Sequence, residues 1–218
     1  PLLPLMIGPV AQNPAVSVTL HDHVALITID NPPVNALGPE VVEGISASID
    51  EVAGNPSIRA AVLIGAGRTF VAGADIKGLE QLAWGSDSGA PEIHELLQKL
   101  EDVPKPVVMA LHGTALGGGL ELGMAGHYRV AVGDAQMGQP EVNLGIIPGA
   151  EGTQRLPRLV GLEKAIEMCV SGKPIKAADA LSAGLIDRVV EGDLSAGASA
   201  FAREMAARAE SHPKTRDR

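Results

Sequence analysis

Cysteine and aromatic side chains are both scarce in this sequence. Cys169 is the single cysteine of the 218 residues, so the chain cannot form an intrachain disulfide. This fits a reducing compartment, where structural disulfides are rare. Phe, Trp and Tyr make up only 2% of the residues. The core is therefore expected to be aliphatic.

Long apolar runs are also missing. No run approaches the roughly 18 to 20 residues that span a bilayer. The opening PLLPLMIGPV is apolar but too short, and no basic residue precedes it as in a secretory signal. We therefore predict no membrane partner and, if the source is bacterial, a cytoplasmic location. The initial proline and the polar end PKTRDR predict a fragment or a processed product.

Positive charge is in deficit. The chain has 26 acidic and 17 basic side chains, a formal net charge of −9. So acidic a protein is a poor general binder of nucleic acid or anionic membranes. An anionic ligand would need local basic groups and backbone N–H donors.

Strand-like and helix-like segments alternate along the chain. Residues 15–20 and 24–30 are rich in β-branched residues and read as strands on either side of a polar turn. Further strands are predicted over 59–67, 106–113, 128–133 and 185–191. Helices are predicted over 41–52, 92–103, 117–126, 161–172, 176–184 and 195–211. This order is typical of the α/β class.

Several weaker motifs carry little information. Gly65 and Gly67 resemble the start of a dinucleotide fingerprint, but Phe70 stands where its third glycine should be. His21 and His23 would share one face of a strand, yet no third metal ligand is near in sequence. We therefore predict no nicotinamide site and no metal site.

One region combines a glycine run with two unusual acids. Gly117–Gly119 follows a predicted buried strand, and the N–H groups of a helix starting there would suit an oxyanion. Glu121 lies about one turn into that apolar helix, and Glu141 follows a Gln-Pro turn. Paired carboxyl groups beside an anion site are suited to acid–base catalysis. A close helix–strand contact with two surface acids is the alternative reading.

The combined motifs resemble the crotonase (enoyl-CoA hydratase/isomerase) family. They are NPPVNAL at 31–37, AGADIKG at 72–78, ALGGGLELG at 115–123 and GQPEVNLGIIPGAEGTQRLPRLVG at 138–161. The resemblance covers residues 15 to about 190. It is strongest to the N-terminal hydratase/isomerase portion of multifunctional fatty-acid oxidation enzymes, through NPPVNA and GGGLELGMAGHYRVA.

The resemblance implies an α/β fold built as a spiral of β-β-α repeats with flanking helices. Residues 1–14 would be an N-terminal extension, and 15–190 the crotonase-like core. Residues 191–218 would be a linker or the start of a truncated C-terminal helical region. A homotrimer, a hexamer or docking onto a dehydrogenase portion would follow from the same resemblance.

The resemblance also implies roles for four residues. The backbone N–H groups of Ala74 and Gly118 would form the oxyanion hole for a thioester carbonyl. Glu141 would exchange the proton at the α-carbon, and Glu121 would orient or deprotonate the water. The implied activity is hydration of trans-2-enoyl-CoA to 3-hydroxyacyl-CoA in fatty-acid β-oxidation, with an additional isomerase activity open.

Substrate contacts are implied for a further set of positions. Gly149 would line the reacting centre, and Asp75, Ile76 and Lys77 would run alongside the coenzyme. Lys77 would meet a phosphate or the adenine region, or be a plain solvated lysine. Coenzyme A is part of the substrate, so no metal or other cofactor is expected.

Two features leave alternatives open. Glu151 stands where the hydratase pattern often has glycine, and would add charge near the site or face solvent. The irregular segment around Trp84 reads as a lid over the acyl chain or as a surface loop. The alternative functions are an acyl-CoA isomerase, a thioester hydrolase on the same scaffold, or a non-catalytic acyl-CoA-binding subunit.

Overall fold

The computed structural model describes residues 14–73, 90–208 and 211–218. The strands of the described part are β1 Val16–His21, β2 Val24–Ile29, β3 Ala60–Gly65, β4 Val71–Ala72, β5 Val107–Leu111, β6 Thr114–Leu116, β7 Tyr128–Val132, β8 Gln136–Gly138, β9 Ile175–Lys176 and β10 Arg188–Val190. The helices are α1 Pro39–Gly54, α3 Ala90–Asp102, α4 Gly118–Ala125, α5 Gly152–Val160, α6 Leu162–Ser171, α7 Ala177–Ser182 and α8 Leu194–Ala206, with 3-10 turns η1 Glu141–Leu144 and η2 Thr215–Asp217.

The strands form two sheets. The larger has the order β1-β2-β3-β5-β7-β10 and is parallel except for the β1–β2 hairpin. The smaller has the order β4-β6-β8-β9. From β3 to β8, each strand of the larger sheet is followed by a strand of the smaller sheet, and helices α3 and α4 separate the pairs. This is the β-β-α repeat implied by the resemblance, and the predicted fold class is confirmed.

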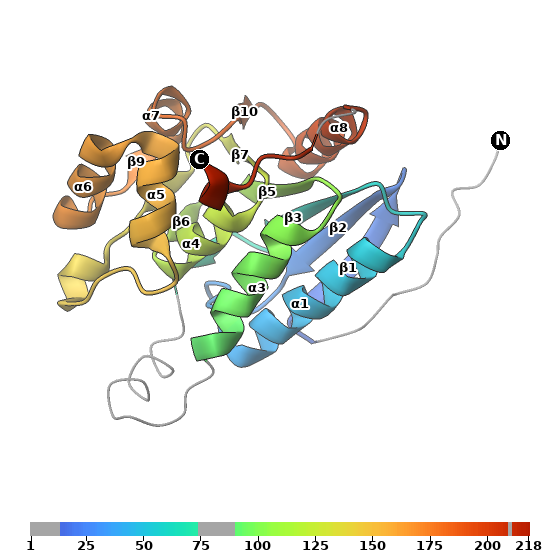
Figure 1. Ribbon diagram of the computed structural model, residues 1–218, viewed down its shortest axis with the longest axis horizontal. Helices are drawn as coiled ribbons and strands as arrows, with labels where there is room; N and C mark the ends of the chain where they lie inside the picture. Colours follow the sequence, from blue (N-terminus) through green and yellow to red (C-terminus); the bar gives the residue numbers. More distant parts are fainter. Residues whose placement is uncertain (1–13, 74–89, 209–210) are drawn as a thin grey trace.

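The six-stranded sheet separates two aliphatic cores, because alternate residues of a strand point to opposite faces. On one face, Ile27, Leu63 and Met109 pack beneath α1 and α3, which lie side by side (Figure 1). On the other face, Val62 and Val108 pack against α8. The aliphatic core expected from the composition is confirmed.

The smaller sheet and α5 are absent from the elements predicted residue by residue. The strands β4, β6, β8 and β9 have only two or three residues each, too few to show a two-residue period. Pro157 interrupts the helical pattern of α5 but is accommodated inside that helix. The predicted helix at 117–126 is confirmed, beginning at Gly118.

The last part of the chain packs onto the fold. Leu194, Phe201 and Met205 of α8 are buried against the sheet. Farther on, the Thr215 hydroxyl donates to the Met124 carbonyl of α4 at 2.8 Å. The domain boundaries at residues 14 and 190 stay predictions. No helix in the described part of the chain is both long enough and apolar enough to cross a bilayer.

Candidate active site

Helix α4 begins at a backbone turn that only glycine adopts readily. Gly117 has φ 54° and ψ −127°, and its N–H donates to the Gly138 carbonyl at 2.9 Å. A Cβ on Gly119 would lie 2.1 Å from the Val71 carbonyl oxygen. The glycines therefore let the start of α4 pack directly against β4, which is the helix–strand contact given as the alternative reading, although both acids are buried. Gly118 is the first residue of α4, so its N–H has no acceptor within the helix.

Glu121 projects from the first turn of α4 into the protein and is only 2% exposed. Its Oε1 accepts a hydrogen bond from the Gly152 N–H at 2.6 Å. Burial raises the pKa of Glu121 to about 7, and the charges of Glu141 and Glu151 add to the rise against the lowering effect of the Gly152 N–H. A carboxyl group with this pKa can accept or release a proton near neutral pH.

Glu141 begins η1 and is 8% exposed. The Gln139 side chain approaches this carboxyl group. The orientation of the amide is assigned from the surrounding donors and acceptors, and in it Nε2 of Gln139 donates to both carboxyl oxygens of Glu141, at 2.9 and 3.1 Å. Burial raises the pKa of Glu141 as well. A Cβ on Gly117, at the start of α4, would lie 3.0 Å from Glu141 Oε1. The two predicted catalytic acids are therefore both buried and both lie at the Gly-rich start of α4.

Gln139 is a site residue that sequence reasoning passed over as part of a turn. It is fully buried. A Cβ on Gly152 would meet the Glu121 carboxyl at 2.7 Å and the Gln139 amide at 2.8 Å. The amide thus lies between the partner of Glu121 and the carboxylate of Glu141. The sequence did contain a signal for this role: glutamine, whose amide can both donate and accept, stands two residues before Glu141.

The other predicted site residues are only partly described. Gly149 is exposed in the turn that leads into α5, three residues before Gly152. Ala74 and Asp75–Lys77 lie outside the described residues, and so does Trp84 with its segment. The oxyanion-hole and coenzyme contacts predicted for them stay predictions.

Glu151 adopts the left-handed conformation, with φ 68°, at the N-cap of α5. Glycine would adopt this conformation without the strain that a Cβ brings. Its Oε2 pairs with Arg155 at 2.7 Å, and Oε1 lies 3.6 Å from His94 Nδ1. Both open readings hold in part, because the side chain is 28% exposed and its charge also reaches Glu121.

The NPPVNA motif has a structural role here. Asn35 is buried with φ 54°, and its Nδ2 donates to the carbonyl oxygens of Ala66, Thr69 and Phe70 at 2.9 to 3.2 Å. The Gly65–Phe70 segment that resembles a dinucleotide fingerprint is therefore a turn between two strands, closed by Asn35. Gly65 is itself tightly packed, since a Cβ there would lie 2.4 Å from two carbonyl oxygens.

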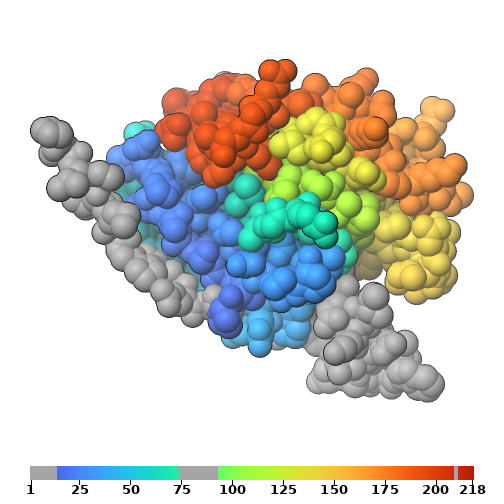
Figure 2. Space-filling view, turned by 180° about the vertical axis from the view of Figure 1, so that it is seen from behind, coloured from blue at the N-terminus to red at the C-terminus, as the bar shows by residue number. Residues whose placement is uncertain are grey.

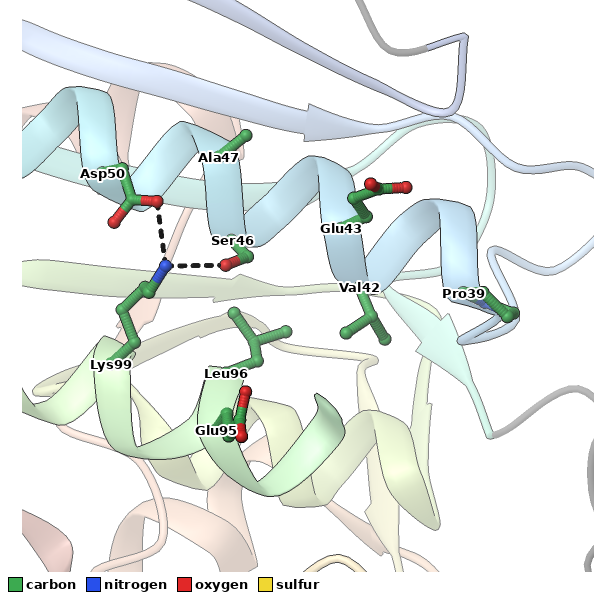
Figure 3. A pocket seen from close by; sticks show the side chains of 9 residues that line it. All are labelled: Pro39, Val42, Glu43, Ser46, Ala47, Asp50, Glu95, Leu96 and Lys99. Carbon is green, nitrogen blue, oxygen red and sulfur yellow. Dashed lines mark hydrogen bonds and ion pairs between the residues drawn. The ribbon is translucent and has the colours of Figure 1, made fainter. Parts of the chain in front are cut away.

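A groove of about 430 Å³ lies between α1 and α3 (Figure 3). Its walls carry Glu43, Asp50 and Glu95, and Lys99 donates to Ser46 and Asp50. The groove contains none of the predicted catalytic residues. Within the described ranges, no group of three or more His, Cys, Asp or Glu side chains is arranged to hold a metal ion.

The geometry agrees with comparisons to known proteins. A family profile described as "Enoyl-CoA hydratase/isomerase" matches residues 19–216. The chain belongs to the enoyl-CoA hydratase/isomerase family. The predicted resemblance is thereby confirmed over nearly the whole described chain.

Individual relatives agree with this assignment. A probable enoyl-CoA hydratase of Bacillus subtilis (strain 168) is 48% identical over 174 residues, which cover 79% of this chain and 67% of that protein. A peroxisomal bifunctional enzyme of Cavia porcellus is 47% identical over 168 residues, 77% of this chain but 23% of that one. The chain thus spans about a quarter of the length of the multifunctional relatives.

Solved structures share the fold. DspI of Pseudomonas aeruginosa superposes with a TM-score of 0.84 at 34% identity, over 92% of this chain and 78% of that one. An enoyl-CoA hydratase from Bacillus anthracis gives a TM-score of 0.82 at 35% identity, over 90% and 78% of the two chains.

Proposed function

We propose that this protein is an enoyl-CoA hydratase, which adds water to trans-2-enoyl-CoA to give 3-hydroxyacyl-CoA in fatty-acid β-oxidation. The observation that carries the proposal is the buried pair Glu121 and Glu141, each held by a neutral donor and each with a raised pKa. One such group can take a proton from water while the other gives a proton to the α-carbon, as hydration of a double bond requires.

The reaction needs an electrophilic β-carbon and a water molecule in place. Donors at the start of α4, with the Gly118 N–H among them, would polarise the thioester carbonyl. The water oxygen would bond to the β-carbon while Glu121 takes a water proton. The double-bond electrons would move onto the carbonyl oxygen, where backbone donors stabilise negative charge. Return of these electrons would take a proton from Glu141 onto the α-carbon. The chemistry needs no cofactor.

The proposal is tested with crotonyl-CoA, by following the loss of conjugated-enoyl absorbance together with the release of free thiol. We expect loss of absorbance without free thiol. Glu121→Gln and Glu141→Gln should each lower kcat by about 10²- to 10⁴-fold, because each removes a proton-transfer group. Release of thiol would instead identify a thioester hydrolase. A folded protein that binds acyl-CoA without turnover would identify a binding subunit.

The same glutamates also allow an isomerase activity. Moving a double bond needs one carboxyl group to carry a proton between two carbons, and Glu141 would do so. A 3-enoyl-CoA substrate tests this, since its conversion to the conjugated isomer raises the absorbance. Conversion that persists in Glu121→Gln and disappears in Glu141→Gln is the expected result. Equal loss in both variants would rule out this division of roles.

We further propose an assembly partner for one apolar edge of the molecule. Leu144, Ile147, Leu162 and Val170 are 66 to 76% exposed, and η1 contacts α6. The yellow atoms of the 141–147 region and the orange atoms of α6 gather at the same edge (Figure 2). Such a patch is typical of a protein interface.

The occupant we propose is a second copy of the chain in a homotrimer or hexamer, or a dehydrogenase portion. Light scattering should give a trimer or hexamer mass, reduced by Val170→Asp. A monomeric wild type would rule out the homo-oligomer.

The single cysteine supports a reducing compartment, and cell fractionation would test the cytoplasmic location proposed for a bacterial source.

A further inference from the structure

Three charged side chains from two helices meet beside the donor that holds Glu121. Arg155 of α5 is 2% exposed, and Glu101 of α3 is fully buried. Arg155 Nη1 lies 2.7 Å from Glu101 Oε1. On its other side, Nε and Nη2 of Arg155 contact Glu151 Oε2 at 2.9 and 2.7 Å. The guanidinium therefore bridges α3 to the N-cap of its own helix.

The clamped turn contains Gly152. Glu151 has φ 68°, a conformation disfavoured for a residue with a Cβ, so an outside contact has to hold it there. The next residue, Gly152, donates its N–H to Glu121 Oε1 at 2.6 Å. The position of that N–H is thus set by the backbone conformation of Glu151. Arg155, one turn farther along α5, binds the carboxylate of Glu151.

The far end of the bridge is also anchored. Glu101 Oε1 accepts from the Arg216 N–H at 3.1 Å, and Lys214 Nζ contacts Asp102 at 2.7 Å. The Thr215 hydroxyl between them donates to Met124 of α4, the helix that carries Glu121. Residues 214–216 therefore tie the end of α3 to the catalytic helix.

We propose that Arg155 is a positioning residue for Glu121: by joining Glu101 to Glu151, it fixes the first turn of α5 and so the Gly152 N–H that holds the carboxyl group. The inference rests on the proposed hydratase function for its effect on turnover. Its effect on the Glu121 carboxyl is independent of that function.

Loss of the Arg155 bridge should shift the titration of Glu121 in one direction. The groups facing Glu121 in the described chain are Glu141 of η1, Glu151 at α5 and Cys169 of α6. Removing the clamp weakens a hydrogen bond to the charged form of Glu121 and frees the charge of Glu151. Both changes favour the protonated form, so the titration of Glu121 moves to higher pH.

The test is the titration of Glu121 by carbon-13 NMR of labelled glutamate, in the wild type and in Arg155→Lys. Lysine keeps the charge but cannot grip both acids in one plane. We expect the midpoint to rise by at least about half a pH unit. The kcat for crotonyl-CoA should fall by about tenfold or more, with KM changed less than about threefold.

Two further variants keep the result interpretable. Asp187→Asn breaks the ion pair of another buried arginine, Arg129, and should lower stability without moving the Glu121 titration. Glu151→Ala removes the clamp, keeps a side chain that disfavours the left-handed conformation, and leaves the Arg155–Glu101 pair intact, so it should fold and should also lower kcat.

The outcomes separate the two proposals. The positioning role would be overturned if folded Arg155→Lys has an unchanged midpoint and kcat and Glu151→Ala has the wild-type kcat. If Arg155→Lys does not fold, wild-type kcat in Glu151→Ala is enough to overturn it. A wild type without hydratase activity, in which Arg155→Lys still shifts the titration, would overturn the function and retain the positioning role.

Discussion

Glu101 and Glu121 are two buried carboxyl groups in contrasting surroundings. Both are almost completely hidden from solvent. Glu101 faces the Arg155 guanidinium at 2.7 Å and accepts from the Arg216 N–H. Glu121 is held by the Gly152 N–H, and no ion pair joins it to a basic side chain among the described residues. Its neighbours include two further acids, and its pKa rises to about 7.

The contrast separates a structural acid from a reactive one. A buried charge is tolerated when a partner charge and hydrogen bonds replace water, and removing one partner then strands the other. A buried carboxyl group without a cation instead holds its proton more tightly and becomes available for proton transfer. The fold thus places Glu101, whose charge is neutralised, on α3, and Glu121, which has no charge partner in the described part of the chain, on α4.

The largest expected difference is in stability. Glu101→Gln should lower the free energy of unfolding by about 3 to 5 kcal/mol, because it leaves the buried Arg155 without the negative charge of its buried partner. Urea unfolding at pH 8 measures this. Glu121→Gln is the matched control, since it removes the same charge from a comparably buried site, and it should not destabilise the protein. Equal losses in the two variants would contradict the distinction between them.

The next effect is a pH dependence specific to Glu121. Its pKa rises from an ordinary 4.5 to about 7 on folding, so the folded state keeps a proton that the unfolded state has lost. Stability relative to Glu121→Gln should therefore fall by up to about 3 kcal/mol as pH rises from 4.5 to 7. Below pH 4.5 the difference should be constant.

The variant serves as the reference because other groups titrate in the same range. Burial lowers the pKa of His127 to about 4, so this residue destabilises the fold as pH falls from 6.5 toward 4. That contribution has the opposite sign and is common to both proteins, so it cancels in the difference. If the difference in the free energy of unfolding between the two proteins stays constant from pH 4.5 to 7, the pKa of Glu121 is not raised on folding. Glu121 would then be either solvated or paired with a positive charge.

Local patterns in the sequence were enough to predict one part of this site. Glu121 was recognisable because an acid interrupts the apolar run Leu120–Ala125, and Glu141 because it follows a stiff Gln-Pro turn. The alternation of strands and helices likewise predicted the α/β class. These signals lie within a few residues of one another, where side-chain period and turn chemistry apply.

The contacts that tune the acids could not be predicted in this way. The donor to Glu121 is a backbone N–H 31 residues farther along the chain, and any residue but proline has that N–H. Asn35 reaches three carbonyl groups 31 to 35 residues away, so its role depends on the finished turn. The strands of the smaller sheet are likewise defined by their partners rather than by their own two or three residues.

The smallest expected effect concerns an ion pair outside both acid sites. Lys99 Nζ contacts Asp50 at 2.9 Å on the wall of the α1–α3 groove, where the side chains are 35% and 67% exposed (Figure 3). Water already solvates both charges, so Lys99→Met should change the free energy of unfolding by less than about 1 kcal/mol. Urea unfolding and the crotonyl-CoA assay measure this, and kcat should stay at the wild-type value. A loss as large as that of Glu101→Gln would contradict the view that burial makes the Glu101–Arg155 pair matter more for stability than an exposed pair. A fall in kcat would instead connect the groove to Glu121 and Glu141.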